Sequence, residues 1–196
     1  MVIDLRRGEG LTVIIGLEHE GNVYMGGDSM AAAAWDSNAT ALRKVFVRTI
    51  EHENYRRSKF LIGYTDSFRM GQILQYHLTM REQILGEEDE AYMVTVFVEA
   101  ARECLKSKGY ARVENNTEVG GQFMVGYNGR LWVVHSNFQV MPYTRGFDAI
   151  GAGQNYALGA MPALKRLAPE KRIRRSLEIT ADLCNGVRAP FVVECI

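Results

Sequence analysis

Residues 12–28 read TVIIGLEHEGNVYMGGD and contain two apolar stretches joined by a short polar turn. Strand-forming residues run through 11–17 and resume at 23–25, and the pivot of the turn is Gly21-Asn22. This pattern predicts an antiparallel β-hairpin near the start of the chain. In such a hairpin the beginning of the first strand lies beside the end of the second.

The remaining sequence alternates between strand and helix patterns. Further strands are expected at 44–47, 59–64, 122–126, 131–135 and 191–193, with a short strand that ends at Ile150. Two amphipathic helices should lie between the early and late strands, with apolar faces formed by Met70, Ile73, Leu74 and Leu78 and by Val94, Phe97, Val98, Ala101 and Leu105. Two more helices should open after Gly153 and at Pro169. This order, with antiparallel hairpins, predicts an α+β fold with helices outside and sheet inside.

Three segments have less regular patterns. The Ala-rich stretch after Ser29 is expected to be irregular, and the charged segment 51–58 is expected to be an exposed loop. The acidic run 87–90 stands just before a predicted helix, where negative charge is favoured by the helix dipole. A cation site is the alternative for that run.

Composition excludes several classes of protein. The 196 residues include 23 Lys and Arg and 23 Asp and Glu, so no net positive charge draws the chain to nucleic acid or to a membrane surface. The first ten residues lack the apolar core of a signal peptide, and no apolar run approaches the roughly 20 residues that cross a bilayer. Three cysteines without paired spacing favour a reduced, cytoplasmic compartment.

The usual cofactor and metal motifs are missing. Gly151-Ala152-Gly153 precedes a helix, but Tyr156 stands where a dinucleotide fingerprint has its third glycine. The four histidines have no metal-ligand spacing. The basic run at 165–175 has no interleaved aromatic residues and is expected to face solvent or a partner. We therefore expect no cofactor and no metal.

Three residues stand at equal intervals at strand ends. Thr12 begins the first strand, Asp28 ends the second, and Lys44 begins the third. Successive members differ by 16 in residue number. The hairpin places Thr12 beside Asp28, and Lys44 would come from an adjoining strand. A strand-edge threonine, a capping aspartate and a surface lysine are the alternative interpretation.

In this register the sequence resembles the proteasome β subunits and their bacterial HslV-like relatives. The matching residues are Thr12-Val-Ile-Ile-Gly-Leu, Gly21, the segment from Val23 to Asp28-Ser29, and Lys44-Val45, followed by Lys59 to Gly63, Phe123 to Gly129 and Ala149 to Gly153. The resemblance implies a four-layer αββα sandwich of the N-terminal nucleophile hydrolase type. It divides the chain into an extension or propeptide, 1–11, and a single domain, 12–196.

The resemblance also assigns roles to the three residues. Thr12 would be the nucleophile, with its own α-amine as base once residues 1–11 are removed, and Lys44 and Asp28 would support it. An N–H in the turn at Tyr64-Thr65 would stabilise the oxyanion. The sequence departs from the family in two places: Leu11 replaces the usual glycine before the nucleophile, and Ala152 replaces a catalytic serine. Asp182 is a loose match to a further family acid.

The resemblance therefore predicts a threonine peptidase acting on peptides or unfolded proteins. It would work inside a homo-oligomeric ring, with an ATP-dependent unfoldase as a partner, in the cytoplasm and without binding nucleic acid or membrane. Two alternatives remain: a catalytically silent scaffold that keeps its N-terminal extension, and a non-peptidase amidase of the same fold.

Overall fold

Two antiparallel sheets form the centre of the molecule. The computed structural model describes residues 12–33, 36–39, 42–53 and 55–196. One sheet has the order β12-β1-β2-β13, with strands at Phe147–Ile150, Ile14–His19, Asn22–Gly27 and Val192–Cys195. The other has the order β11-β10-β9-β6-β5, with strands at Val140–Pro142, Arg130–Val134, Phe123–Tyr127, Arg57–Tyr64 and Val45–Glu51.

The predicted N-terminal hairpin is present, with its turn one residue earlier than expected. His19 pairs with Asn22, so Glu20 and Gly21 are the two turn residues. Both have positive φ, 50° and 77°, as the tight turns that match strand twist require. The second hairpin turns at Asn128-Gly129 as predicted, again with positive φ at both residues.

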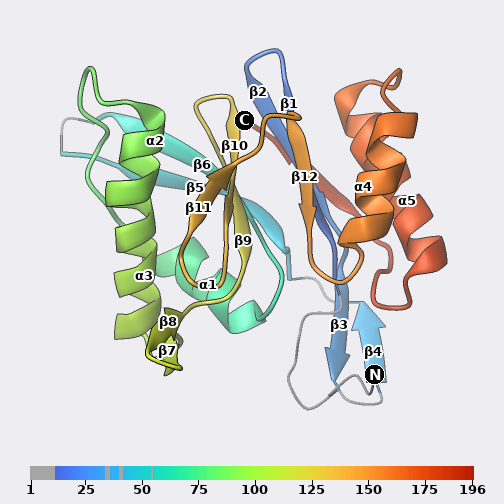
Figure 1. The fold of residues 1–196 in the computed structure, drawn as a ribbon, viewed down its shortest axis with the longest axis horizontal. Helices are drawn as coiled ribbons and strands as arrows, with labels where there is room; N and C mark the ends of the chain where they lie inside the picture. The colour runs from blue at the N-terminus through green and yellow to red at the C-terminus, as the bar shows by residue number, and fades with distance from the viewer. Residues whose placement is uncertain (1–11, 34–35, 40–41, 54) are drawn as a thin grey trace.

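The elements form four layers, with a sheet-on-sheet centre and helices on both outer faces (Figure 1). Three apolar clusters fill the spaces between these layers. The two sheets pack face to face through side chains such as Ile14, Met25, Leu61 and Leu131. Helices α4 (Gln154–Ala163) and α5 (Pro169–Leu183) cover the outer face of the first sheet. Helices α1 (Phe68–His77) and α3 (Val98–Ser107) cover the outer face of the second. The αββα sandwich predicted from the sequence is confirmed.

The helical segment before α3 differs in detail from the prediction. It begins as α2 (Asp89–Tyr92), continues as a π-helical turn (Met93–Phe97) and then becomes α3. The wider π turn changes the rotation of the side chains, and Val94 is 45% exposed although Phe97 is buried. The other residues expected on this apolar face are buried, and only the prediction for Val94 is wrong.

Side chains of the acidic run are held by neighbouring groups. Glu87 forms an ion pair with Arg81, 2.6 Å between Oε1 and Nη2. Asp89 accepts hydrogen bonds from the side-chain amides of Gln83 and Asn128, at 3.0 and 2.9 Å. Among the described residues no cluster of His, Cys, Asp and Glu has the arrangement of a metal site. These contacts support the helix-start interpretation of the run.

Several short strands were not predicted. The Ala-rich segment forms a small hairpin of β3 (Met30–Ala33) and β4 (Asp36–Ala39), which corrects the expectation of irregular structure. β5 and β6 extend into the charged segment 51–58, so the connecting loop is shorter than expected. A further small hairpin joins β7 (Arg112–Glu114) to β8 (Thr117–Val119).

The basic run is only partly free to bind a partner. Arg172 donates to the carbonyl of Met161 at 2.9 Å and lies over the ring of Phe147. Arg175 pairs with Glu178 on the same helix at 2.7 Å. The contacts of Arg172 link α5 to α4 and to β12. Within the part of the chain described, no helix is long and apolar enough to cross a bilayer.

Helix α5 offers a matched test of the outer core. Leu177 is completely buried against the first sheet, whereas Leu183 on the same helix is 59% exposed. Leu177→Ala is expected to lower the free energy of unfolding by about 2–5 kcal/mol, because it leaves a cavity. Leu183→Ala should change it by less than about 0.5 kcal/mol. Urea denaturation of both variants measures the difference, and equal losses would contradict the packing described.

Candidate active site

Three strand ends converge on one buried point between the sheets. Thr12 lies two residues before β1, Asp28 follows β2, and Lys44 precedes β5. β1 and β2 pair directly, whereas β5 belongs to the facing sheet. All three residues are buried, with 0%, 1% and 4% of their surface exposed. The structure thus brings together the three residues selected from the sequence.

The side chains of these residues are in direct contact. Lys44 Nζ donates to Thr12 Oγ1 at 2.8 Å and to both carboxylate oxygens of Asp28, at 3.3 and 3.1 Å. The Thr12 hydroxyl donates to Asp28 Oδ1, and this same oxygen accepts the N–H of Val13 at 3.1 Å. The threonine oxygen therefore lies between an ammonium and a carboxylate. A strand-edge threonine with a surface lysine does not describe this arrangement.

Burial changes the acid–base character of Lys44. Removal from water lowers the pKa of its ammonium, while the adjacent Asp28 carboxylate acts in the opposite direction and raises it. The aromatic ring of Phe68 contributes to the cover, with its centroid 5.8 Å from Nζ. A lysine with a lowered pKa exchanges its proton more readily near neutral pH than an exposed lysine does.

The main chain of Thr12 is held by the turn before α4. Gly153 donates its N–H to the carbonyl of Thr12 at 3.2 Å. Gly151 has a φ of 93°, and a Cβ placed on it would come within 2.6 Å of the same carbonyl oxygen. Glycine is therefore required at 151, both for the backbone angle and for the close approach. Because Ala152 lies between these glycines, no hydroxyl is available there to organise a terminal amine.

Two backbone amides of the turn that was expected to supply the oxyanion donor already form hydrogen bonds. The N–H of Tyr64 donates to the carbonyl of Lys44 at 3.1 Å, and that of Thr65 donates to the carbonyl of Gln122 at 3.3 Å. These two amides are therefore not free for a reaction intermediate. The role expected for the turn as a whole stays a prediction. Asp182 is exposed near the end of α5, where it acts on Arg175, so it also does not join the Thr12 site.

Sequence reasoning missed the aromatic residues beside Lys44. Phe68 opens α1, and Tyr64 ends β6. Tyr64 was considered only for its backbone, at the end of a strand and in the predicted oxyanion turn, and Phe68 was not selected. No sequence signal connects either of them to Lys44, because the contact depends on how α1 packs on the second sheet.

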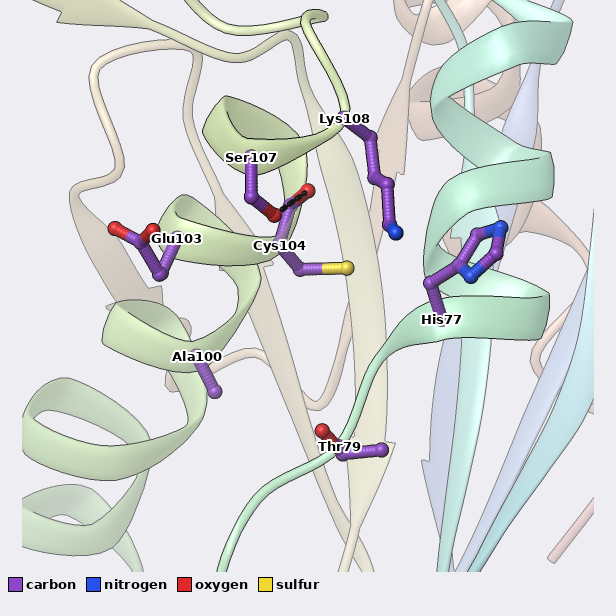
Figure 2. Close-up of a pocket in the computed structure, with 7 residues that line it drawn as sticks. All are labelled: His77, Thr79, Ala100, Glu103, Cys104, Ser107 and Lys108. Carbon is purple, nitrogen blue, oxygen red and sulfur yellow. Dashed lines mark hydrogen bonds between the residues drawn. The ribbon is translucent and has the colours of Figure 1, made fainter.

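A separate pocket lies at the other end of α1 (Figure 2). It has a volume of about 230 Å³ and is lined by His77, Thr79, Ala100, Glu103, Cys104, Ser107 and Lys108. Phe68 and His77 stand at opposite ends of this helix, about 14 Å apart along its axis, so the pocket is distinct from the Thr12 site. Burial raises the pKa of the Cys104 thiol, which keeps it protonated and a poor nucleophile.

Similarity to solved structures defines the class of the fold, which is the proteasome-like αββα sandwich. The structure of Thiobacillus denitrificans BPH superposes with a TM-score of 0.73, at 18% identity over 94% of this chain and 97% of that chain. HslV from Trypanosoma brucei gives 0.61 at 19% identity, covering 94% and 98%. Anbu from Yersinia bercovieri gives 0.65 at 12% identity, covering 94% and 81%.

Sequence similarity identifies a more particular relative. The chain is 26% identical to the ATP-dependent protease subunit HslV of Geobacillus sp. (strain WCH70), over 93% of this chain and 96% of the relative. No family model matches the sequence. The chain is thus a homologue of HslV with a proteasome-like fold, and the resemblance inferred from its residues is confirmed.

Proposed function

We propose that this protein is a threonine peptidase of the proteasome/HslV kind, with Thr12 as its nucleophile after residues 1–11 are removed. The observation that supports this most strongly is the buried contact of Thr12 Oγ1 with Lys44 and Asp28. Similarity to a protease subunit over nearly the whole chain supports the same class of reaction.

The reaction follows from the chemistry of a terminal threonine. Before processing, the Thr12 nitrogen belongs to a peptide bond and cannot act as a base. Once freed, the amine has a reference pKa near 8 and accepts the hydroxyl proton as Oγ1 attacks a peptide carbonyl. The amine then returns the proton to the leaving nitrogen, and water hydrolyses the resulting ester. Lys44 stabilises negative charge on Oγ1, and Asp28 holds Lys44 in place.

We infer the setting of this reaction from the relatives. The Geobacillus relative is described as an ATP-dependent protease subunit. We therefore propose a homo-oligomeric ring in the cytoplasm that receives peptides or unfolded proteins, with an ATP-dependent unfoldase as partner. Size-exclusion chromatography with light scattering tests the ring directly, and a monomer at micromolar concentration would contradict it.

A silent scaffold is the second candidate. Three features favour it: Thr12 is completely buried, Ala152 supplies no hydroxyl, and the Tyr64 and Thr65 amides are occupied. In this case residues 1–11 would stay attached and the protein would contribute only to assembly. A third candidate is an amidase of the same fold. It would use the same Thr12 nucleophile but would hydrolyse small amides instead of peptides.

Intact mass measurement distinguishes the first two candidates. We expect the purified wild-type chain to lose residues 1–11 and to begin at Thr12, whereas Thr12→Ala and Lys44→Ala keep them. Thr117→Ala, which changes an exposed threonine on β8, is the matched control and should process normally. If the wild type and all variants keep their first residues apart from the initiator Met, Thr12 has no free amine and the scaffold is favoured.

Covalent labelling and substrate panels complete the test. The structure of Thiobacillus denitrificans BPH has been solved in complex with epoxomicin. We expect the processed form of this chain to gain the mass of one epoxomicin per subunit, with the adduct on Thr12. Fluorogenic peptides compared with simple amides then separate a peptidase from a small-amide hydrolase.

A further inference from the structure

Two aromatic residues contact Lys44 and its main chain. Tyr64 donates its N–H to the carbonyl of Lys44 at 3.1 Å and its hydroxyl to the carbonyl of Arg43 at 3.3 Å. Tyr64 therefore donates hydrogen bonds to two consecutive carbonyls just before β5. The Tyr64 side chain is itself buried, at 3% exposure, so its hydroxyl bond forms away from most competing water.

Phe68 contacts the side-chain ammonium of Lys44. Its ring meets the Tyr64 ring edge-on, at 6.3 Å between centroids, and lies 5.8 Å from Lys44 Nζ. That distance is within the range of a cation–π contact. Phe68 is only half-buried, so it separates the ammonium from solvent on one side.

The pair is fixed in place by the packing of α1. A Cβ added at Gly71 would lie 2.1 Å from Cε1 and Cζ of Tyr64, so the helix backbone presses directly on that ring. Phe46 packs on the Tyr64 ring, at 6.3 Å between centroids. Neither Tyr64 nor Phe68 would touch a substrate through these contacts, which are directed at Lys44 and its neighbours.

We propose that Tyr64 and Phe68 are positioning residues for the Thr12 site, which set the place of Lys44 and exclude water from its ammonium. The inference rests on the proposed function for its effect on rate. Its effect on Lys44 itself is independent of any activity. Asp28 is the charged group in contact with the ammonium, while the adjacent Arg43 is paired with Glu194 at 2.7 Å.

Each residue has a different expected effect. Phe68→Ala opens the ammonium to water and also removes the cation–π contact, two changes that act on the pKa in opposite directions. Because burial is the largest influence on Lys44, we expect its pKa to rise and the alkaline limb of the rate profile to move to higher pH with it. Tyr64→Phe keeps the ring and loses the bond to Arg43. We expect it to lower the rate about 3- to 30-fold, through misplacement of Lys44, without moving that limb.

The packing of Gly71 supplies a variant that changes neither aromatic residue. Gly71→Ala must displace the Tyr64 ring, so it should lower the rate at least as much as Tyr64→Phe. The controls are Tyr76→Ala, an exposed aromatic on the same helix, Tyr127→Phe, which loses a buried hydroxyl bond to Gln83, and Gly159→Ala, where nothing obstructs a Cβ. These three should leave both the rate and the alkaline limb unchanged.

The experiment measures the Lys44 titration by NMR of the full chain labelled with ¹⁵N-lysine, assigned with Lys44→Arg, alongside rate profiles from pH 6 to 11. A raised Lys44 pKa in Phe68→Ala and slowed turnover in Tyr64→Phe and Gly71→Ala support the proposal. An unchanged Lys44 titration in Phe68→Ala overturns it, as does equal slowing by the Tyr127 and Gly159 controls. If the wild type has no activity, the proposed function fails, but the titration still decides whether Phe68 shields Lys44.

Discussion

Thr12→Ala is expected to lower peptide hydrolysis by at least about 1,000-fold, because it removes the attacking oxygen from the reaction. The same oxygen accepts a hydrogen bond from the Lys44 ammonium at 2.8 Å, and neither Lys44 nor Asp28 carries a hydroxyl that could replace it. Steady-state hydrolysis of a fluorogenic peptide by the purified chain measures the loss.

Two variants separate the chemistry from the fold. Thr12→Ser keeps a hydroxyl at the same position and should retain measurable hydrolysis. Thr117→Ala should match the wild type, because Thr117 is exposed on β8. Hydrolysis by Thr12→Ala at the wild-type rate would show that the nucleophile lies elsewhere.

Lys44→Met is expected to reduce the free energy of unfolding by about 3–5 kcal/mol, because it leaves the Asp28 carboxylate buried without its counter-ion. The Thr12 hydroxyl and the Val13 N–H still donate to the carboxylate, but neither carries a compensating charge. Urea denaturation at neutral pH measures this loss, which should be accompanied by loss of hydrolysis.

The double variant Asp28→Asn/Lys44→Met tests the same pair in the opposite direction. Removing both charges should restore most of the lost stability, since no buried charge remains without a partner. Hydrolysis should stay absent, because the ammonium is still missing. Arg57→Met is the control: it breaks an exposed pair with Glu51 and should change stability by at most about 1 kcal/mol. A double variant no more stable than Lys44→Met would contradict this account.

The sequence predicted the parts of the fold that depend on local patterns. Both large hairpins have short apolar runs joined by tight turns, and the Asn128-Gly129 turn occurs where expected. Thr12 and Asp28 could be placed together because they occupy opposite ends of one hairpin. Placing Lys44 beside them required the family resemblance, since β5 lies in the other sheet.

Other features depend on packing that no local pattern specifies. The π turn that exposes Val94 follows from how α2 and α3 join over the second sheet. The engagement of the Tyr64 and Thr65 amides depends on β5 and on the residue before β9, which are distant in sequence. The sequence alone did not exclude these two amides as oxyanion donors, and the role expected for the turn as a whole stays a prediction.

Gly153 donates to the Thr12 carbonyl, and Gly151 lies close to the same oxygen. This arrangement has a consequence for maturation. Thr12 is fixed on its C-terminal side, and its side chain already contacts Lys44 and Asp28, while its nitrogen is still part of the Leu11–Thr12 bond. Cleavage of that single bond would change the covalent state of the nitrogen without requiring a rearrangement of the side chains around it. The inactive and active forms would then share one architecture, and a lineage that lost the cleavage would keep a folded subunit with its cluster of three residues intact.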